Sequence, residues 1–161
     1  MSVPHLTAII LTRDERDFIE ACIDSLAWVD QIVVFDSGSQ DGTQALARAR
    51  GACVIEHPFV DFASQRNAAL EQVESDWVFF VDADERATPE LAEEVRRVID
   101  ERPEAGWWAP RHNYIVGRCI MHAGWYPDYQ LRLLRRERAR YDPARKVHEV
   151  VLLDGDEGYL Q

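Results

Sequence analysis

Four short runs of apolar residues recur through the first half of the sequence. They cover Leu6–Leu11, Ile32–Phe35, Ala52–Ile55 and Trp77–Val81. Each run is continuous and does not alternate with polar residues, which is typical of parallel strands buried on both faces. We therefore expect four strands in one mostly parallel sheet.

Helical patterns fill the intervals between these runs. Apolar residues recur with helical spacing in Phe18–Leu26, and shorter stripes lie in Ala45–Ala49 and Phe62–Val73. A fourth stripe extends over Thr88–Ile99, where the threonine can cap the helix and Pro89 suits its first turn. Strands that alternate with helices predict an α/β fold with a doubly wound, Rossmann-like sheet flanked by helices.

The pattern changes at Pro103–Gly106, which predicts a turn. Aromatic residues then gather within a short stretch: Trp107, Trp108, Tyr114, Trp125, Tyr126 and Tyr129. Gln130–Arg136 and Val147–Leu153 predict further strands, and the last residues predict no terminating element. No linker or repeat separates the two parts. We therefore expect a single domain over residues 1–161, with residues 103–161 forming a mixed-strand lobe on the sheet built by residues 1–102.

The charge composition of the sequence narrows the classes of ligand that the protein is expected to bind. The 161 residues carry 29 acidic and 18 Lys or Arg side chains, a formal charge of −11. This balance argues against a general nucleic-acid binder, because phosphate backbones are bound mainly through Lys and Arg. A small anionic ligand stays possible if a metal ion or local arginines neutralise it.

The cysteines indicate the compartment. Cys22, Cys53 and Cys119 form no CxxC pair, so they predict neither a zinc site nor a disulfide framework. Cys22 and Cys53 fall on predicted core faces and are expected to act as small hydrophobic residues. The sequence shows no signal peptide and no apolar run long enough to span a membrane. We expect a cytoplasmic protein.

Carboxylates follow three of the four predicted strands. The first strand leads into Thr12–Glu15, the second into Asp36–Thr43 and the fourth into Asp82–Glu85. Ligands of open α/β sheets bind at these carboxyl ends. Singly, such residues are ordinary solvated caps, but clustered carboxylates at one edge favour a divalent cation such as Mg²⁺ or Mn²⁺. The sequence lacks both a P-loop and the dinucleotide-binding glycine pattern.

Several motifs together carry a family resemblance. Leu6–Glu15, Asp36–Thr43, Phe62–Asn67, Asp76–Arg86 and Trp125–Arg132 occur in the order found in inverting family 2 glycosyltransferases of the GT-A fold. The sequence most resembles the branch that adds sugars to the lipopolysaccharide core. That branch usually has Asn-Glu-Glu where this sequence has Arg13-Asp-Glu. Members of the family usually continue beyond the position of Gln161, so we expect this sequence to lack their C-terminal continuation.

The resemblance implies a role for each matching residue. It implies that Thr12, Asp14 and Glu15 line the nucleotide and that Asp36 contacts its base. Arg66 would face the diphosphate or buttress Asp36. The resemblance further implies a metal site and a base: Asp82 near ribose and metal, Asp84 as the metal ligand, and Asp128 as catalytic base.

Three features of the second half have both a structural and a functional interpretation. Seven positive charges lie between Arg132 and Lys146, Arg135 among them, and they either pair with the surplus acids or attract a phosphorylated acceptor or an anionic membrane surface. Trp125 is either a core residue or a platform for an acceptor sugar. His148 is either structural or a contact to the metal or diphosphate.

The resemblance therefore implies a metal-dependent inverting hexosyltransferase with Mn²⁺ or Mg²⁺ as cofactor. UDP-hexose is the default donor, and a cell-envelope glycan or glycolipid is the acceptor, reached from the inner face of the cell membrane. Two alternatives stay open. One is a nucleotide-sugar-binding remnant without turnover. The other is a haloacid-dehalogenase-like phosphatase, which Arg86 disfavours because that motif has Thr or Val at this position.

Overall fold

The computed structural model describes residues 2–115, 117–119, 121, 126–145 and 148–161. The helices and strands follow in chain order: β1 (Leu6–Thr12), α1 (Arg16–Ser25), β2 (Gln31–Asp36), α2 (Thr43–Ala49), β3 (Cys53–Glu56), α3 (Phe62–Gln72), β4 (Trp77–Asp82), α4 (Pro89–Glu101), β5 (Gly106–Arg111), β6 (Tyr114–Ile115), β7 (Arg118–Cys119), β8 (Asp128–Arg135), a 3₁₀ turn (Arg136–Arg138), β9 (Ala139–Tyr141), β10 (Val151–Leu153) and β11 (Glu157–Tyr159).

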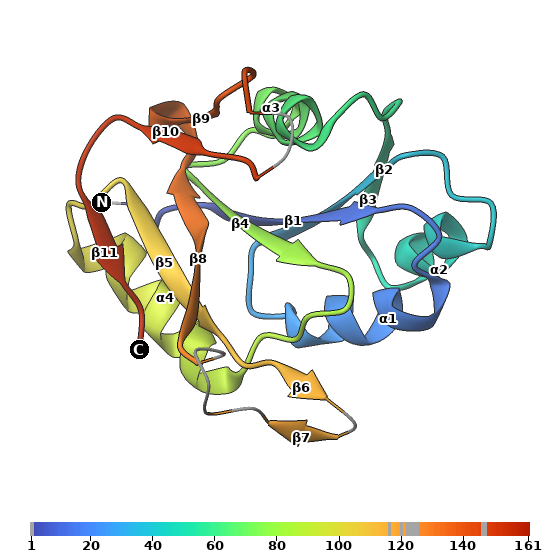
Figure 1. The fold of residues 1–161 in the computed structure, drawn as a ribbon, viewed down its shortest axis with the longest axis horizontal. Helices are drawn as coiled ribbons and strands as arrows, with labels where there is room; N and C mark the ends of the chain where they lie inside the picture. The colour runs from blue at the N-terminus through green and yellow to red at the C-terminus, as the bar shows by residue number, and fades with distance from the viewer. Residues whose placement is uncertain (1, 116, 120, 122–125, 146–147) are drawn as a thin grey trace.

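A single seven-stranded sheet organises this α/β fold (Figure 1). Its strand order is β11-β5-β8-β4-β1-β2-β3. The pairs among β1, β2, β3 and β4 are parallel, as is the pair of β5 with β11. β8 runs antiparallel to both of its neighbours, β4 and β5. Because β8 runs opposite to both of these neighbours, the start of β8 lies at the same edge as the carboxyl ends of β1, β2, β4 and β5.

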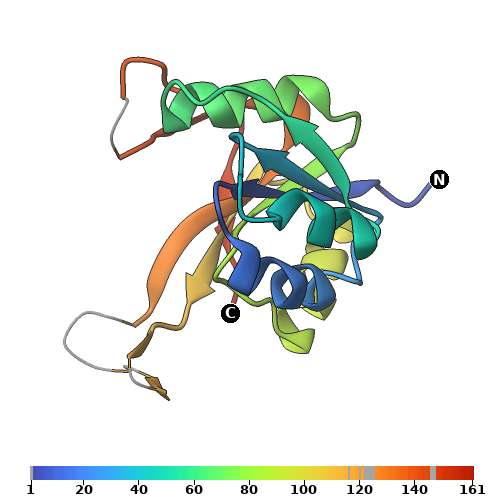
Figure 2. The same ribbon diagram turned by 90° about the vertical axis from the view of Figure 1, so that its right-hand side faces the viewer.

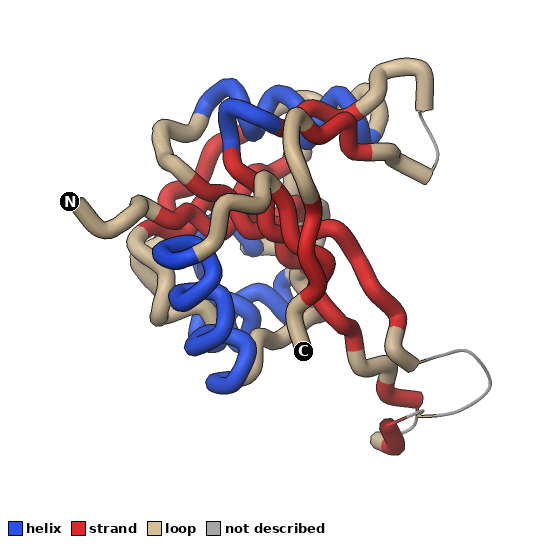
Figure 3. Tube along the Cα trace, turned by 90° about the vertical axis from the view of Figure 1, so that its left-hand side faces the viewer, coloured by secondary structure: helices blue, strands red, loops and turns tan. Residues whose placement is uncertain are grey.

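Helices and a small two-stranded sheet cover the two faces. Helices α1, α2 and α4 lie on one face, while α3 and the β9–β10 pair lie on the other (Figures 2 and 3). The short hairpin β6–β7 projects beyond the sheet. No helix of the described residues is both long and apolar enough to cross a membrane.

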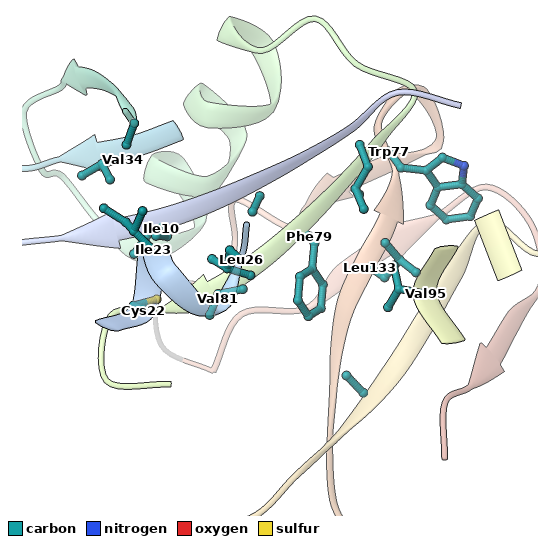
Figure 4. Close-up of a cluster of buried hydrophobic side chains, with 14 of the residues drawn as sticks. Ile10, Cys22, Ile23, Leu26, Val34, Trp77, Phe79, Val81, Val95 and Leu133 are labelled. Atoms are coloured by element: carbon teal, nitrogen blue, oxygen red, sulfur yellow. The ribbon is translucent and has the colours of Figure 1, made fainter. Parts of the chain in front are cut away.

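The core follows from the continuous apolar strands. Successive side chains of a strand point to opposite faces. Phe79 of β4 therefore packs towards α1 and α4, in the cluster that Figure 4 shows, whereas Phe80 packs under α3. Thr88 accepts a hydrogen bond from the backbone N–H of Leu91, as a helix cap should. The four predicted strands and four predicted helices of the first half are confirmed, with ends shifted by a few residues.

Three predictions need correction. The strand expected at Val147–Leu153 is only Val151–Leu153 within the described residues, and β11 forms where no further element was expected. Cys53 is exposed although we placed it on a core face, because β3 is the edge strand of the sheet. Cys22 is fully buried, as expected.

Candidate functional site at the carboxyl edge of the sheet

The strand register places the predicted site residues side by side. Thr12 of β1 pairs with Asp36 of β2, and the residue before Thr12 pairs with Asp82 of β4. Two strands further along the sheet, Arg111 at the end of β5 pairs with Asp128 at the start of β8. The predicted carboxylates therefore meet at one edge of the sheet.

Asp36 is fully buried and its carboxylate is saturated with hydrogen bonds from the chain itself. The hydroxyls of Thr12 and Ser39 donate to Oδ1 over 2.6 and 2.5 Å. The backbone N–H groups of Gly38 and Ser39 and the side-chain amide of Gln44 donate to Oδ2 over 2.9, 2.8 and 2.7 Å. Burial favours the neutral acid, but these donors outweigh it and lower the pKa of Asp36.

Five donors exceed the roughly four lone-pair positions of a carboxylate. Asp36 therefore has no free position for a nucleotide base unless a donor from the chain gives way. By accepting hydrogen bonds from Gly38 and Ser39, Asp36 fixes the conformation of the loop after β2. Its predicted contact with the base stays a prediction.

The loop after β1 is tied to the loop after β2. Asp14 donates its backbone N–H to the hydroxyl of Ser39 over 2.8 Å, and its carboxylate accepts from the backbone N–H of Gln40 over 2.7 Å. Its backbone is left-handed, with φ of 56°, which Asp tolerates better than most residues. Glu15 donates its backbone N–H to the hydroxyl of Thr43 over 2.9 Å.

Negative charge accumulates in front of these loops. Burial raises the pKa of Glu15, and the nearby carboxylates of Asp84, Asp41, Asp82 and Asp14 raise it further. Asp84 is exposed, and its carboxylate has no hydrogen-bond or ion-pair partner in the described part of the chain. An anionic ligand needs added positive charge to bind here.

Asp82 is held by two arginines. The Nη2 atom of Arg132 donates to Oδ2 of Asp82 over 2.8 Å, and Nη2 of Arg66 lies 3.7 Å from Oδ1. Burial alone would raise the pKa of Asp82, but the hydrogen bond and charge of Arg132 hold it below its usual value, with further help from Arg66.

Arg66 is a residue of α3, and its side chain is only 12% exposed. Its guanidinium stands over the rings of Phe80 and Tyr141, 4.9 and 5.5 Å from their centres, and its Nε donates to Glu149 over 3.2 Å. The ion-pair partners of Arg66 in the described residues are therefore Asp82 and Glu149. The neighbouring Gln65 contacts the loop after β2, donating to the hydroxyl of Ser37 over 3.0 Å.

Asp128 is fixed at the start of β8. Arg111 donates from Nε and Nη2 to Oδ2 over 2.9 and 2.5 Å, and Gln130 donates to Oδ1 over 2.9 Å. Asn113 adds a long contact of 3.4 Å to Oδ2. Burial would raise the pKa of Asp128, but the hydrogen bonds of Gln130 and Arg111 lower it, so this carboxylate is ionised at neutral pH.

Glu85 connects the two halves of the edge. Its Oε1 accepts from Nη2 of Arg132 over 3.1 Å and lies 3.7 Å from Nη1 of Arg111. The charges from Asp82 through Arg132, Glu85 and Arg111 to Asp128 therefore alternate in sign. Arg111 was not among the residues predicted from the sequence, although it ends β5, a strand that runs parallel to β4, and the rule of strand ends applies to it too.

Arg135 is not brought to this cluster, and no contact described for His148 joins it to the cluster. Arg135 lies at the other end of β8, opposite Trp77, where its guanidinium stands 4.5 Å from the centre of the Trp77 ring. His148 is exposed on the loop before β10. Trp125 lies outside the described residues.

The donor set fits a hard divalent cation. In the described residues, no three His, Cys, Asp or Glu side chains are arranged to hold a metal by themselves. Mg²⁺ and Mn²⁺ are commonly held by one or two carboxylates together with phosphate oxygens of the substrate. The unpartnered carboxylate of Asp84 and the uncompensated charge around Glu15 suit that arrangement.

Two cavities flank the start of β8. One, of about 970 Å³, lies beside β9 and β10 and is lined by Asp82 and Arg66. The other, of about 500 Å³, lies beside the loop after β4 and is lined by Asp84 and Glu85. Arg111, Gln130 and Arg132 line both cavities. The cluster of charges therefore has open space on two sides.

The mostly parallel seven-stranded sheet with flanking helices is the GT-A fold of solved glycosyltransferases. The model of the family described as "Glycosyl transferase family 2" matches residues 7–150. The chain belongs to this family.

Two curated relatives illustrate the likeness in sequence. The chain is 35% identical over 159 residues to the lipopolysaccharide core biosynthesis glycosyltransferase LpsC of Rhizobium meliloti, covering 95% of this chain and 59% of that protein. It is 32% identical to a TPR repeat-containing protein of Synechococcus elongatus, covering 93% of this chain and 36% of that protein. The chain thus spans well under two thirds of the length of these relatives.

Solved structures share the fold. TarS of S. aureus superposes with a TM-score of 0.63 at 22% identity, covering 82% of this chain and 47% of that one. Mannosyl-3-phosphoglycerate synthase of Rubrobacter xylanophilus gives a TM-score of 0.59 at 27% identity, covering 66% and 40%. Glucosyl-3-phosphoglycerate synthase of Mycobacterium tuberculosis, solved with Mn²⁺ and UDP, gives 0.58 at 23% identity, covering 71% and 46%.

Proposed function

We propose that this chain transfers a sugar from a nucleotide-sugar donor to a hydroxyl group of an acceptor, with inversion at the anomeric carbon. The observation that carries the proposal is the edge of the sheet, where Asp82 ends β4, Asp84 follows in the next turn and Asp128 opens the reversed strand β8. Membership of family 2 and the UDP present in one fold neighbour support it.

Residues 1–102 form the donor half in this proposal. The loops after β1 and β2, held together by Asp14 and Asp36, present Thr12 and Glu15 to the nucleotide. Asp82 lies on the ribose side, and Asp84 is the residue that would hold Mg²⁺ or Mn²⁺ beside the diphosphate. When bound, the cation supplies positive charge that stabilises the leaving nucleoside diphosphate.

Asp128 acts as the base. Its ionised carboxylate accepts the proton of the acceptor hydroxyl while the acceptor oxygen bonds to the anomeric carbon. The bond between that carbon and the diphosphate oxygen breaks on the opposite side, and the diphosphate leaves with the electron pair. Arg111 and Gln130 hold Asp128 in place for this step.

Residues 103–161 form the acceptor half. The cavity beside β9 and β10 has space for part of a glycan, and Trp125 remains a candidate platform for one of its sugars. The likeness to an enzyme of lipopolysaccharide core biosynthesis supports a cell-envelope glycan or glycolipid as the acceptor. A cytoplasmic position at the inner face of the membrane would follow from such a substrate. The acceptor and the donor sugar are proposals about the whole enzyme.

The test of this function is turnover of a nucleotide sugar. We expect release of UDP from UDP-glucose or UDP-galactose in the presence of Mn²⁺, followed in a coupled assay, with transfer to lipopolysaccharide core oligosaccharides as acceptors. Asp128→Asn keeps the shape of the side chain but cannot take a proton, so we expect kcat to fall about 10²–10⁴-fold while donor affinity changes little.

Asp100→Asn is the matched control, because it makes the same substitution at an exposed position near the end of α4, and we expect it to leave turnover unchanged. Near-normal turnover of Asp128→Asn would assign the base elsewhere, and Glu85 and Glu149 would then be tested in turn. Donor binding without any turnover would identify a nucleotide-sugar-binding remnant.

A further inference from the structure

Arg132 has an unusual place in the sheet. In the pairing of β5 with β8, Trp107 stands opposite Leu133 but the next residue, Trp108, stands opposite Leu131. Arg132 is therefore the extra residue of a β-bulge, a feature that re-aims a side chain and is frequent beside active sites. Leu131 and Leu133 consequently pack on opposite faces of the sheet although they are two residues apart.

The bulge directs the guanidinium of Arg132 into the charged edge. The residue is nine-tenths buried, and its Nη2 donates to both Asp82 and Glu85. Its Nη1 is buried and has no hydrogen-bond partner among the described residues. A buried donor without an acceptor costs free energy, typically about 1–3 kcal/mol. We therefore expect Nη1 to gain an acceptor when a ligand binds.

An anionic ligand would supply that partner. Arg132 lines both cavities, one of which is also lined by Asp82 and the other by Asp84. The carboxylates around it repel a diphosphate, whereas a guanidinium can bind carboxylates and phosphate at the same time through separate nitrogen atoms. Nη2 is engaged by the carboxylates, which leaves Nη1 for a phosphate oxygen.

We propose that Arg132 belongs to the donor site, where its Nη1 binds the diphosphate of the nucleotide, and not to the acceptor side. The proposal rests on the proposed function, since it needs a nucleoside diphosphate as ligand. Arg132 would then hold the ground-state donor and stabilise the charge that develops on the leaving group, alongside the cation bound at Asp84.

The experiment measures binding of UDP, UMP and uridine to the full chain by calorimetry in the presence of Mn²⁺. Arg132→Lys keeps a positive charge beside Asp82 and Glu85 but loses the second nitrogen. We expect it to fold and to weaken UDP binding about fivefold or more, with uridine affinity unchanged. Arg132→Met is expected to weaken UDP binding about tenfold or more, as for loss of a hydrogen bond between charged groups.

Arg135→Met is the matched control. It removes an arginine from the same strand, but at the opposite end, where the guanidinium donates to the backbone carbonyls of Glu104 and Arg102. We expect it to leave UDP affinity unchanged. Circular dichroism and thermal unfolding establish that each variant is folded, and Arg132→Lys decides the question if Arg132→Met does not fold.

The outcomes separate this proposal from the proposed function. Equal weakening of UDP and uridine, or unchanged UDP affinity in folded Arg132→Lys, would overturn the assignment of Arg132 while leaving a nucleotide-binding protein. If the unaltered chain bound none of UDP, GDP, ADP and CDP with Mn²⁺, the proposed function and the role of Arg132 would both be overturned. Inorganic pyrophosphate with Mn²⁺ tests the phosphate contact independently of the base.

Discussion

At the scale of single residues, the carboxylates of the site differ sharply in what they can do. Asp36 is enclosed by donors of its own chain, and Asp82 is shared between two arginines. Asp84 is exposed, and none of the residues that the structure describes pairs with its carboxylate. A saturated carboxylate can shape a loop, whereas a carboxylate with open lone pairs can accept a cation. Residue type and spacing in the sequence could not separate these roles, because they depend on contacts between distant loops.

The saturation of Asp36 predicts a pH-dependent contribution to stability. Asp36→Asn replaces one accepting oxygen by a donating amide, so buried N–H groups lose their acceptor. We expect the free energy of unfolding at pH 7 to fall by about 1–3 kcal/mol. Because the folded-state pKa is lowered, the stabilisation is complete above the unfolded-state value near about 4 and is lost as pH falls through the folded-state pKa.

Urea unfolding followed by tryptophan fluorescence at pH 7 and at successively lower pH below 4 measures this difference. Asp100→Asn, at an exposed position near the end of α4, is the control and should change stability little. A gap between the unaltered chain and Asp36→Asn that stays constant down to the lowest pH would contradict the argument.

At the scale of elements, the parallel half of the fold was predictable and the second lobe was less so. Continuous apolar runs define β1, β2 and β4 because these strands are buried on both faces. β11 has no such signal, since Glu157-Gly-Tyr has little intrinsic strand preference and owes its conformation to pairing with β5. The bulge at Arg132 is likewise a property of two strands and not of one sequence segment.

The close packing of β11 predicts an effect of a single methyl group. Gly158 pairs with Trp107, and a Cβ atom there would overlap the buried Trp107 ring. Overpacking of a core typically costs about 1–3 kcal/mol, so we expect Gly158→Ala to lower the free energy of unfolding by that amount. Thermal and urea unfolding measure it. Leu152→Ala on the exposed face of β10 is the control, and equal stability of both variants would show that β11 is only loosely attached.

At the scale of the whole molecule, the fold brings several arginines together at one edge of the sheet, although the protein as a whole is acidic. The formal charge is −11, yet Arg66, Arg111 and Arg132 converge on the edge that carries Asp82 and Asp128. The strand-end rule identified this edge from sequence because parallel strands must bring their carboxyl ends together. The same rule gave no position for Arg135, which lies at the far end of the antiparallel strand β8. Arg111 was not predicted as a site residue.

The central claim is that this edge binds a nucleoside diphosphate together with a divalent cation, and calorimetric titration of UDP with Mn²⁺ and with EDTA tests it most directly. Asp84→Asn leaves the described hydrogen bonds and ion pairs of the edge intact but weakens the proposed metal ligand. We predict that Mn²⁺ strengthens UDP binding to the unaltered chain by about tenfold or more, and that Asp84→Asn removes this enhancement without lowering the melting temperature. Equal UDP affinity with Mn²⁺ and with EDTA in the unaltered chain would contradict the claim.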